Sequence, residues 1–444
     1  MRMTRDSGWG VSATCVALIL TSATVLYAAE PDPALSLRVD QLLRQLNDEE
    51  SARRDDAEQE LFKLAPTDLE ECDAFMLLLP EPLEGMPAEV RLRLSWVRQR
   101  IERRQGDKEL VASRLTLSAS AMDLSAVLKV VQEQTSNELM DYRDQFGQDA
   151  QPRNVTIEIE NEAFWPAIDK ILDATEMSLY PFAEEEALAV INREERAAPR
   201  VGRASYVGPF RIEPLAVVAR RSLRSPSEQG ASVELEIAWE PRLQPIALSQ
   251  PAEGLEIVAG DGSPITVRNP EASFDVEVQV GSHATELTIP LTLPPRGVSS
   301  IASFQGRLSA LVPGRTVEFR FNELDKPQSV EQRRGGVRVT LSGLRKNQAL
   351  WEVHMRLQVE SEEAGLESHR GWVFQNATYL LNKNEEIIDH AGFETTMQSE
   401  REIGLAYFFE LPDDAIGEYT WVYRTPAAIV RVPVEYELKE IPLP

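Results

Sequence analysis

From about residue 204 to the end of the sequence, apolar side chains recur at every second position, and this alternation limits the fold more than any other feature. Alternation places one set of side chains on one face of a strand, with that face toward a core and the other toward water. The clearest runs are residues 233–239, 274–280, 286–293 and 317–321. Turn-forming residues stand at 260–262, 294–297 and 312–314. Short strands with regular turns predict an antiparallel β-sandwich over residues 204–325.

A second set of alternating runs follows a linker that begins at Asp325. These runs are residues 337–341, 351–357, 419–424 and 430–438. Tyr379–Ile388 is predicted as a hairpin whose turn lies at Asn382–Asn384. We therefore expect a second, immunoglobulin-like sandwich over residues 335–444.

The N-terminal part has helical rather than alternating spacing. The first helical face contains Leu35, Val39, Leu42, Leu43 and Leu46, and the second contains Ala57, Leu61 and Leu64. Two further helical segments cover Leu69–Leu79 and Pro87–Arg104, with prolines between them. Paired helices with leucine-rich faces make residues 35–105 resemble a HEAT-like module of one or two repeats, with a plain helical bundle as the alternative.

Residues 113–192 contain a pattern that repeats after forty positions. A strand at 115–119 precedes a helix that contains Val127, Leu128 and Val131, and a strand at 155–159 precedes a helix that contains Ala167, Ile168 and Ile171. Two more strands are expected near 177–180 and 187–191. These elements predict a small α+β domain with two βα units.

This α+β domain resembles the short N-terminal modules of secretins and TonB-dependent receptors. The corresponding stretches are Leu115–Thr135 and Val155–Thr175. Ser136-Asn137 and Glu176-Met177 stand where the families have a glycine after the helix. The resemblance implies binding of partner proteins and no catalysis, while the alternative is a generic two-layer α+β domain.

Residues 1–29 have the order of a secretory signal peptide. Arg2 and Arg5 form a short basic region, Val11–Leu26 is apolar, and small residues close the segment at Ala28-Ala29. An uncleaved N-terminal anchor is the alternative. Because Cys15 lies inside this segment, Cys72 is the only cysteine of the expected mature chain, so we expect no disulfide and a periplasmic or extracellular location in a bacterium.

The composition is strongly acidic, with 72 Asp and Glu against 46 Lys and Arg and a formal net charge of −26. A surface of this sign repels phosphate backbones and anionic membranes. We therefore expect no nucleic acid among the partners, and membrane contact only if the signal segment is kept as an anchor. Envelope proteins or polysaccharide are the partners that remain.

The usual catalytic and ligand-binding motifs are missing from the sequence. The four histidines are far apart, at His283, His354, His369 and His390, which argues against a zinc site. No G-x-S-x-G elbow and no phosphate-binding glycine loop is present. We therefore predict no catalytic residue, no metal and no cofactor.

Two chemical hypotheses survive this search. The first is a hydrolase that uses an unrecognised carboxylate pair, for which Glu158, Glu160 and Asp389 are weak candidates. The second is a carbohydrate-binding face on the last sandwich, with Trp372, Phe374 and Trp421 as candidate ligand-stacking residues. Core filling is the more common role of such rings.

The order of modules as a whole resembles that of uncharacterised exported multidomain proteins of planctomycete-type bacteria. The features that carry this resemblance are the HEAT-like start, the phrase Glu240-Pro241-Arg242-Leu243 and the tail Val432–Pro444. The leading hypothesis is a non-enzymatic envelope protein that acts in macromolecular interaction or scaffolding. Carbohydrate binding through the C-terminal sandwich is the alternative, and the hydrolase is weaker still.

Overall fold

The computed structural model describes residues 33–444 with short gaps. The gaps are 81, 83–84, 182, 184–186, 226–228, 280, 327–328, 348–349, 360–370, 400–401 and 412–415. The predicted signal segment therefore lies outside the described residues. The chain divides into two compact units, residues 1–80 and 81–444. The fold is mostly β, with 46% of residues in strands and 24% in helices, so the predicted β-rich multidomain class is correct.

The first unit consists of helices over its described part. They are α1 (Pro33–Gln45), α2 (Ser51–Leu64) and α3 (Leu69–Leu78). The faces predicted from helical spacing are inside, because Val39, Leu42 and Leu61 are all buried. Cys72 on α3 is buried as well. Among the helices described anywhere in the chain, none has both the length and the apolar content needed to cross a membrane.

The fourth predicted helix, α4 (Ala88–Glu109), belongs to the second unit. It packs on strands β13 (Ser300–Phe321) and β21 (Thr420–Pro442). Gly106 lies so close to β21 that a Cβ built on it would stand 3.2 Å from Val430 Cγ2. The predicted helical module at 35–105 is thus divided between two units, because α4 buries its apolar face on a sheet within its own unit.

The α+β module follows the predicted order. Its elements are β1 (Arg114–Asp123), α5 (Leu124–Thr135), β2 (Leu139–Asp141), β3 (Asn154–Ala163), α6 (Phe164–Thr175), β4 (Met177–Tyr180) and β5 (Leu188–Asn192). Strands β1 and β3 pair with each other, and β2, β5 and β4 form a second sheet. The backbone repeats after forty residues, because Ser136 and Glu176 both end their helices in the left-handed conformation, at φ 56° and 52°. Glycine is the residue most often found in this conformation at the end of a helix.

The first sandwich has two facing sheets. One sheet runs in the order β12 (Ala284–Leu291), β8 (Gly230–Trp239), β7 (Phe210–Arg220) and β6 (Ser205–Val207). The other contains β9 (Ala247–Pro251), β10 (Leu255–Ala259) and β11 (Ser273–Glu277), together with β13 (Ser300–Phe321) and β21 (Thr420–Pro442). The core between them joins Leu235 of β8 to Phe304 of β13 and Leu438 of β21.

The second β body shares two of these strands. Its five-stranded sheet runs β14 (Val330–Arg334), β15 (Val337–Asn347), β16 (Leu350–Val359), β20 (Glu402–Glu410) and β19 (Gly392–Gln398). The opposite layer contains β17 (Thr378–Leu381), β18 (Ile387–Asp389) and the far halves of β13 and β21. The predicted hairpin is present as β17–β18, and Asn382 Oδ1 accepts hydrogen bonds from the backbone of Asn384 and Glu386.

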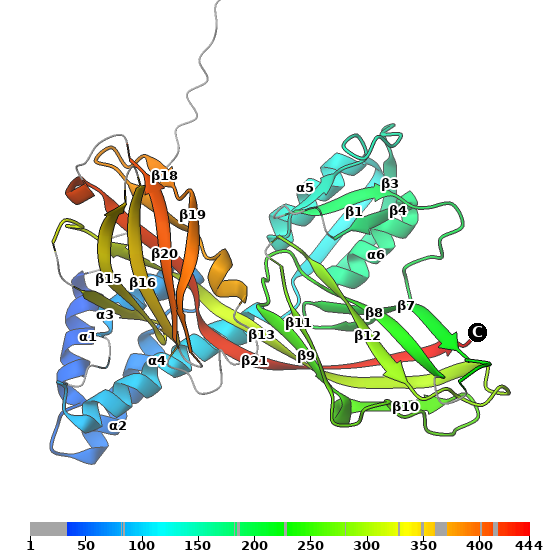
Figure 1. Ribbon diagram of the computed structural model, residues 1–444, viewed down its shortest axis with the longest axis horizontal. Helices are drawn as coiled ribbons and strands as arrows, with labels where there is room; N and C mark the ends of the chain where they lie inside the picture. Colours follow the sequence, from blue (N-terminus) through cyan, green and yellow to red (C-terminus); the bar gives the residue numbers. More distant parts are fainter. Residues whose placement is uncertain are drawn as a thin grey trace, which may run out of the picture. The chain divides into compact units, whose positions relative to one another are not determined.

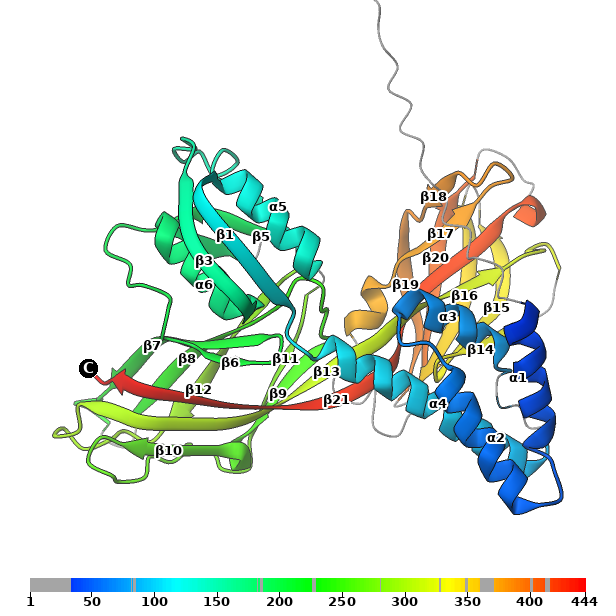
Figure 2. The same cartoon turned by 180° about the vertical axis from the view of Figure 1, so that it is seen from behind.

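Strands β13 and β21 form one continuous antiparallel ribbon, from Ser300 opposite Pro442 to Phe321 opposite Trp421 (Figures 1 and 2). The turn predicted at residues 312–314 is wrong, since β13 continues through it and Pro313 pairs with Ile429. Pro313 lies just beyond Leu311, the last residue of β13 that pairs with β9, so its missing N–H falls where only one neighbour strand is present. The two β bodies on either side of the boundary expected near residues 325–335 therefore share these two strands, and each body has a core of its own.

The ribbon contains one glycine that its packing requires. Gly306 lies opposite Tyr436, and a Cβ built on Gly306 would overlap the Tyr436 ring. We expect Gly306→Ala to lower the free energy of unfolding by about 1–3 kcal/mol through overpacking, measured by urea denaturation. Gly297→Ala is the matched control, because nothing lies within 4 Å of a Cβ at that position. Equal stability of the two variants would contradict this account of the ribbon.

Candidate functional site

The three candidate stacking residues lie in the core of the second β body. Trp421 is fully buried, stacks on Phe321 at 5.1 Å between ring centroids, and donates its indole N–H to Thr378 Oγ1 at 2.7 Å. Trp372 is 9% exposed, and Phe374 is half-buried against the parallel ring of Phe393 at 6.0 Å. A fully buried ring has no face for a sugar, so Trp421 does not provide the stacking surface that the sequence led us to expect.

The candidate carboxylates are dispersed. Glu158, Glu160 and Asp389 are all exposed, and Glu158 accepts a hydrogen bond from Ser118 at 2.8 Å on the open face of β1 and β3. Over the part of the chain that the structure describes, no group of three or more His, Cys, Asp or Glu side chains is arranged to hold a metal ion.

A fully buried carboxylate, that of Asp169 on α6, lies at the junction of the α+β module with the first sandwich. Its side chain is fully buried and lies 2.9 Å from Nε of Arg211, which is itself fully buried on β7. Arg200 Nε lies 2.7 Å from the other oxygen, and the Tyr206 hydroxyl donates to the carboxylate at 2.7 Å. Burial, together with this carboxylate, raises the pKa of Tyr206.

Arg211 extends this network into the first sandwich. Its guanidinium lies 2.6 Å from Glu213 Oε2 and 3.7 Å from Glu236 Oε1. Burial raises the pKa of Glu236, and the positive charge of Arg211 opposes the shift without cancelling it. Each member of the network is therefore engaged with another protein group, as expected for charges that fix a junction.

The charged segment 193–204, which connects the α+β module to the first sandwich, is tied to the same helix. The carboxylate of Asp173 accepts hydrogen bonds from the backbone of Arg200 at 2.9 Å and of Val201 at 3.0 Å, and it forms an ion pair with Arg193. The Trp165 indole of α6 also donates to the carbonyl of Pro209 at 2.9 Å. These bonds hold the α+β module in a fixed position on β7.

A second buried carboxylate, Glu240, makes another contact between the same two modules. It accepts hydrogen bonds from the Ser113 backbone at 3.0 Å and from Asn137 Nδ2 at 3.0 Å, and it pairs with Arg242 at 2.7 Å. Arg242 in turn donates to the carbonyl of Val111 at 2.6 Å. The phrase Glu240–Leu243, noted in the sequence for its resemblance, thus fastens the end of β8 to the start of β1.

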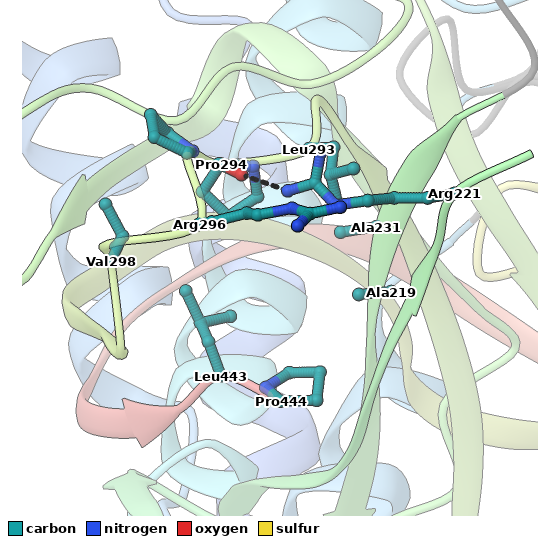
Figure 3. A pocket seen from close by; sticks show the side chains of 10 residues that line it. Ala219, Arg221, Ala231, Leu293, Pro294, Arg296, Val298, Leu443 and Pro444 are labelled. Atoms are coloured by element: carbon teal, nitrogen blue, oxygen red, sulfur yellow. Dashed lines mark hydrogen bonds between the residues drawn. The ribbon is translucent and has the colours of Figure 1, made fainter. Parts of the chain in front are cut away.

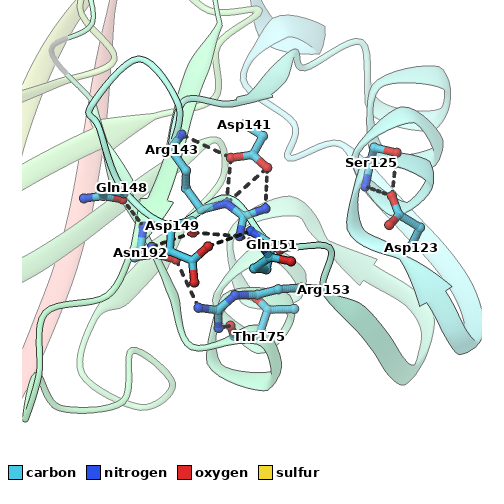
Figure 4. Close-up of polar contacts among 10 residues, drawn as sticks. All are labelled: Asp123, Ser125, Asp141, Arg143, Gln148, Asp149, Gln151, Arg153, Thr175 and Asn192. Atoms are coloured by element: carbon cyan, nitrogen blue, oxygen red, sulfur yellow. Dashed lines mark hydrogen bonds and ion pairs between the residues drawn. The ribbon is translucent and has the colours of Figure 1, made fainter.

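A loop of the α+β module is organised around a buried arginine, as Figure 4 shows. Arg143 binds the carboxylate of Asp141 with two nitrogens, at 2.9 and 2.6 Å, and holds the pKa of Asp141 below its usual value. It also donates to the carbonyl of Gln151 at 3.0 Å. The arginine thus joins the two ends of the connection between β2 and β3.

The far side of this loop is fastened to β5. Gln148 accepts a hydrogen bond from the backbone of Asn192 at 2.7 Å, and the Asn192 amide donates to the carbonyl of Asp149 at 3.0 Å. Arg153 bridges Asn192 and the carbonyl of Thr175 (Figure 4). The loop therefore has a defined conformation set by side chains on both of its flanks.

One side chain of this loop forms an exposed apolar surface together with two side chains of the neighbouring strands β2 and β4. Phe146 and Tyr180 meet edge to face at 5.0 Å, and Met140 and Tyr180 flank Ala189 in one row across the sheet. All three side chains are exposed, by 45% for Phe146, 39% for Met140 and 36% for Tyr180. We call Met140, Phe146 and Tyr180 the aromatic patch.

A separate hollow lies at the end of the first sandwich. Its volume is about 350 Å³, and its walls include Ala231, Leu293 and Val298. Arg221 and Arg296 also line it, and Arg221 donates to the carbonyl of Pro294 at 3.1 Å (Figure 3). Its walls are thus both polar and apolar, and two arginines are among them.

No known protein-family profile and no curated protein matches this sequence. The functional argument therefore depends on the surfaces and charges described above.

Sequence reasoning missed Asp169, although a signal was present. Asp169 falls four residues after Trp165 and three before Leu172, both of which are buried on α6. An acid on the apolar face of a helix indicates a buried charge that needs a partner. The aromatic patch gave no comparable signal, because its members are far apart in the sequence.

When Asp169 loses its charge, the buried positive charge of Arg211 loses one of the negative charges that stabilise it. We expect Asp169→Asn to lower the free energy of unfolding by about 3–5 kcal/mol, measured by urea denaturation. Glu435→Gln is the control, since Glu435 pairs with Arg307 at the surface and such pairs contribute about 0–1 kcal/mol. A loss as small as that of the control would show that the network does not stabilise the junction.

The raised pKa of Glu236 predicts a dependence of stability on pH. The folded state holds the Glu236 proton more tightly than the unfolded state, so this contribution to stability is lost as the pH rises above the unperturbed value of 4.5. Glu236→Gln cannot ionise, so its stability relative to wild type should improve as the pH rises above 4.5. Denaturation at a series of pH values measures this, and a difference independent of pH would contradict it.

Proposed function

We propose that this protein is a non-enzymatic, exported envelope protein that acts in macromolecular interaction, with the aromatic patch as its contact for another protein. The observation that carries the proposal is the exposure of Met140 on β2, Tyr180 on β4 and Phe146 on the adjoining loop, which is held by buried polar contacts. Aromatic and methionine side chains are enriched where proteins meet, and rigid presentation lowers the entropic cost of binding.

The charges around the patch define the chemistry of the partner. Glu138, Asp144 and Asp149 are all exposed close to it in the chain. An apolar partner segment flanked by lysine or arginine fits a patch with an acidic rim. The resemblance of this module to the partner-binding modules of secretins and TonB-dependent receptors is in accord with the same role.

The other modules act in this proposal as a support. Each β body has two facing antiparallel layers with a core between them, which is in accord with the immunoglobulin-like sandwiches expected from the sequence. The signal-like order of residues 1–29 supports export. Carbohydrate binding through Trp372, Phe374 and Trp421 has less support, because these rings pack into the core.

The proposal predicts that partner proteins bind through the aromatic patch. Phe146→Ala/Tyr180→Ala should weaken retention of partners cross-linked from an envelope extract by about thirtyfold, the effect of losing an interface hot spot. The readout is quantitative mass spectrometry of the captured proteins.

Val330→Ala/Ile387→Ala is the matched control, because these apolar side chains are also exposed but lie on β14 and β18. The control should capture the same set as wild type. Unchanged capture by the patch variant, at unchanged stability, would refute the proposed function.

A further inference from the structure

One end of the first sandwich gathers arginines in a chain whose net charge is −26. We call these five exposed residues the arginine end. They are Arg220, Arg221, Arg224, Arg268 and Arg296. They come from the end of β7, the connection to β8, the segment before β11 and the segment after β12.

The fold brings these residues together from distant parts of the sequence. Arg220 pairs with Gly230 across β7 and β8, and the guanidinium of Arg268 would stand 3.3 Å from a Cβ built on the same glycine. Arg221 and Arg296 both line the hollow (Figure 3). The positive charge is therefore concentrated at one place.

This charge is not neutralised within the described part of the chain. None of the five guanidinium groups forms an ion pair with a carboxylate of the described residues. Along the sequence, the acids nearest to them are Glu271, three residues after Arg268, and Glu228, four residues after Arg224, so five positive charges stand against two negative ones in these segments. Because the screening length is about 10 Å at 0.1 M salt, the local charge, and not the total of −26, acts on a surface in contact.

An apolar side chain stands among the arginines. Leu223 lies between Arg221 and Arg224 in the sequence and is 97% exposed, the highest value among the exposed large apolar residues of the described chain. At that exposure it adds little to the stability of the fold. Basic residues around a protruding apolar side chain are the arrangement by which proteins attach to the interface of an anionic bilayer.

We propose that the arginine end docks the protein on an anionic lipid surface. Leu223 enters the boundary between headgroups and acyl chains, and the guanidinium groups bind lipid phosphates. Arg221 and Arg296 provide paired donors of the geometry that suits a phosphate group. A soluble polyanion would use the same charges, but it has no use for an exposed leucine, and this favours the lipid.

The test compares binding of the full chain to vesicles of phosphatidylcholine alone with binding to vesicles of equal parts phosphatidylcholine and phosphatidylglycerol. Reporting the ratio of the two removes any contribution of residues 1–29 that does not depend on lipid charge. We expect clear preference for the anionic vesicles, weakened by added salt. Arg221→Gln/Arg296→Gln should lower that affinity about 25-fold, at roughly fivefold for each arginine, and Leu223→Ser about tenfold.

Arg196→Gln/Arg203→Gln is the matched control, since it removes two exposed arginines of the segment 193–204 and should leave binding unchanged. Equal binding to both kinds of vesicle, or equal loss in the control, would overturn the proposal. Arginine-dependent binding that Leu223→Ser does not weaken, with equal affinity for soluble polyphosphate, would assign the site to a polyanion instead. Salt-sensitive self-association without lipid would assign it to the acidic surface of a second copy.

Discussion

The hydrogen-bonded ribbon of β13 and β21 is the constraint on which the rest of the second unit depends. One half of the ribbon supplies Phe304 and Leu438 to the core of the first sandwich, and the other half supplies Phe319 and Trp421 to the core of the second. Since both strands cross from one core to the other without a break, the two β bodies have no flexible hinge between them along this path. Helix α4 packs on the same two strands and reinforces them.

Buried polar contacts fix the α+β module to the first sandwich, just as the ribbon fixes the two sandwiches to each other. Asp169 with Arg211, and Glu240 with Arg242, fasten it to β7 and β8 through bonds that depend on direction and distance. An apolar contact permits sliding, whereas a buried ion pair with further hydrogen bonds permits one arrangement only. The aromatic patch and the arginine end are therefore carried by a single framework, on which their separation and orientation are fixed by the junction bonds.

Much of this fold could be predicted from the sequence, because alternation and helical spacing are local signals. The strands at 233–239 and 351–357, the hairpin at 379–388 and the two βα units all follow from them. The continuity of β13 through Pro313 could not be predicted, because a proline is tolerated there only for want of a second neighbour strand. The candidate sites were equally hidden, since Phe146 and Tyr180, or Arg221 and Arg296, meet only once the chain is folded.

The ribbon also determines the order in which the chain can fold. The first sandwich begins at β6 but needs Val434, Tyr436 and Leu438 of β21 to complete its core, more than two hundred residues later. Contacts of such long range form slowly, and here they cannot form until the last strand has been synthesised. The sandwich thus stays open throughout translation.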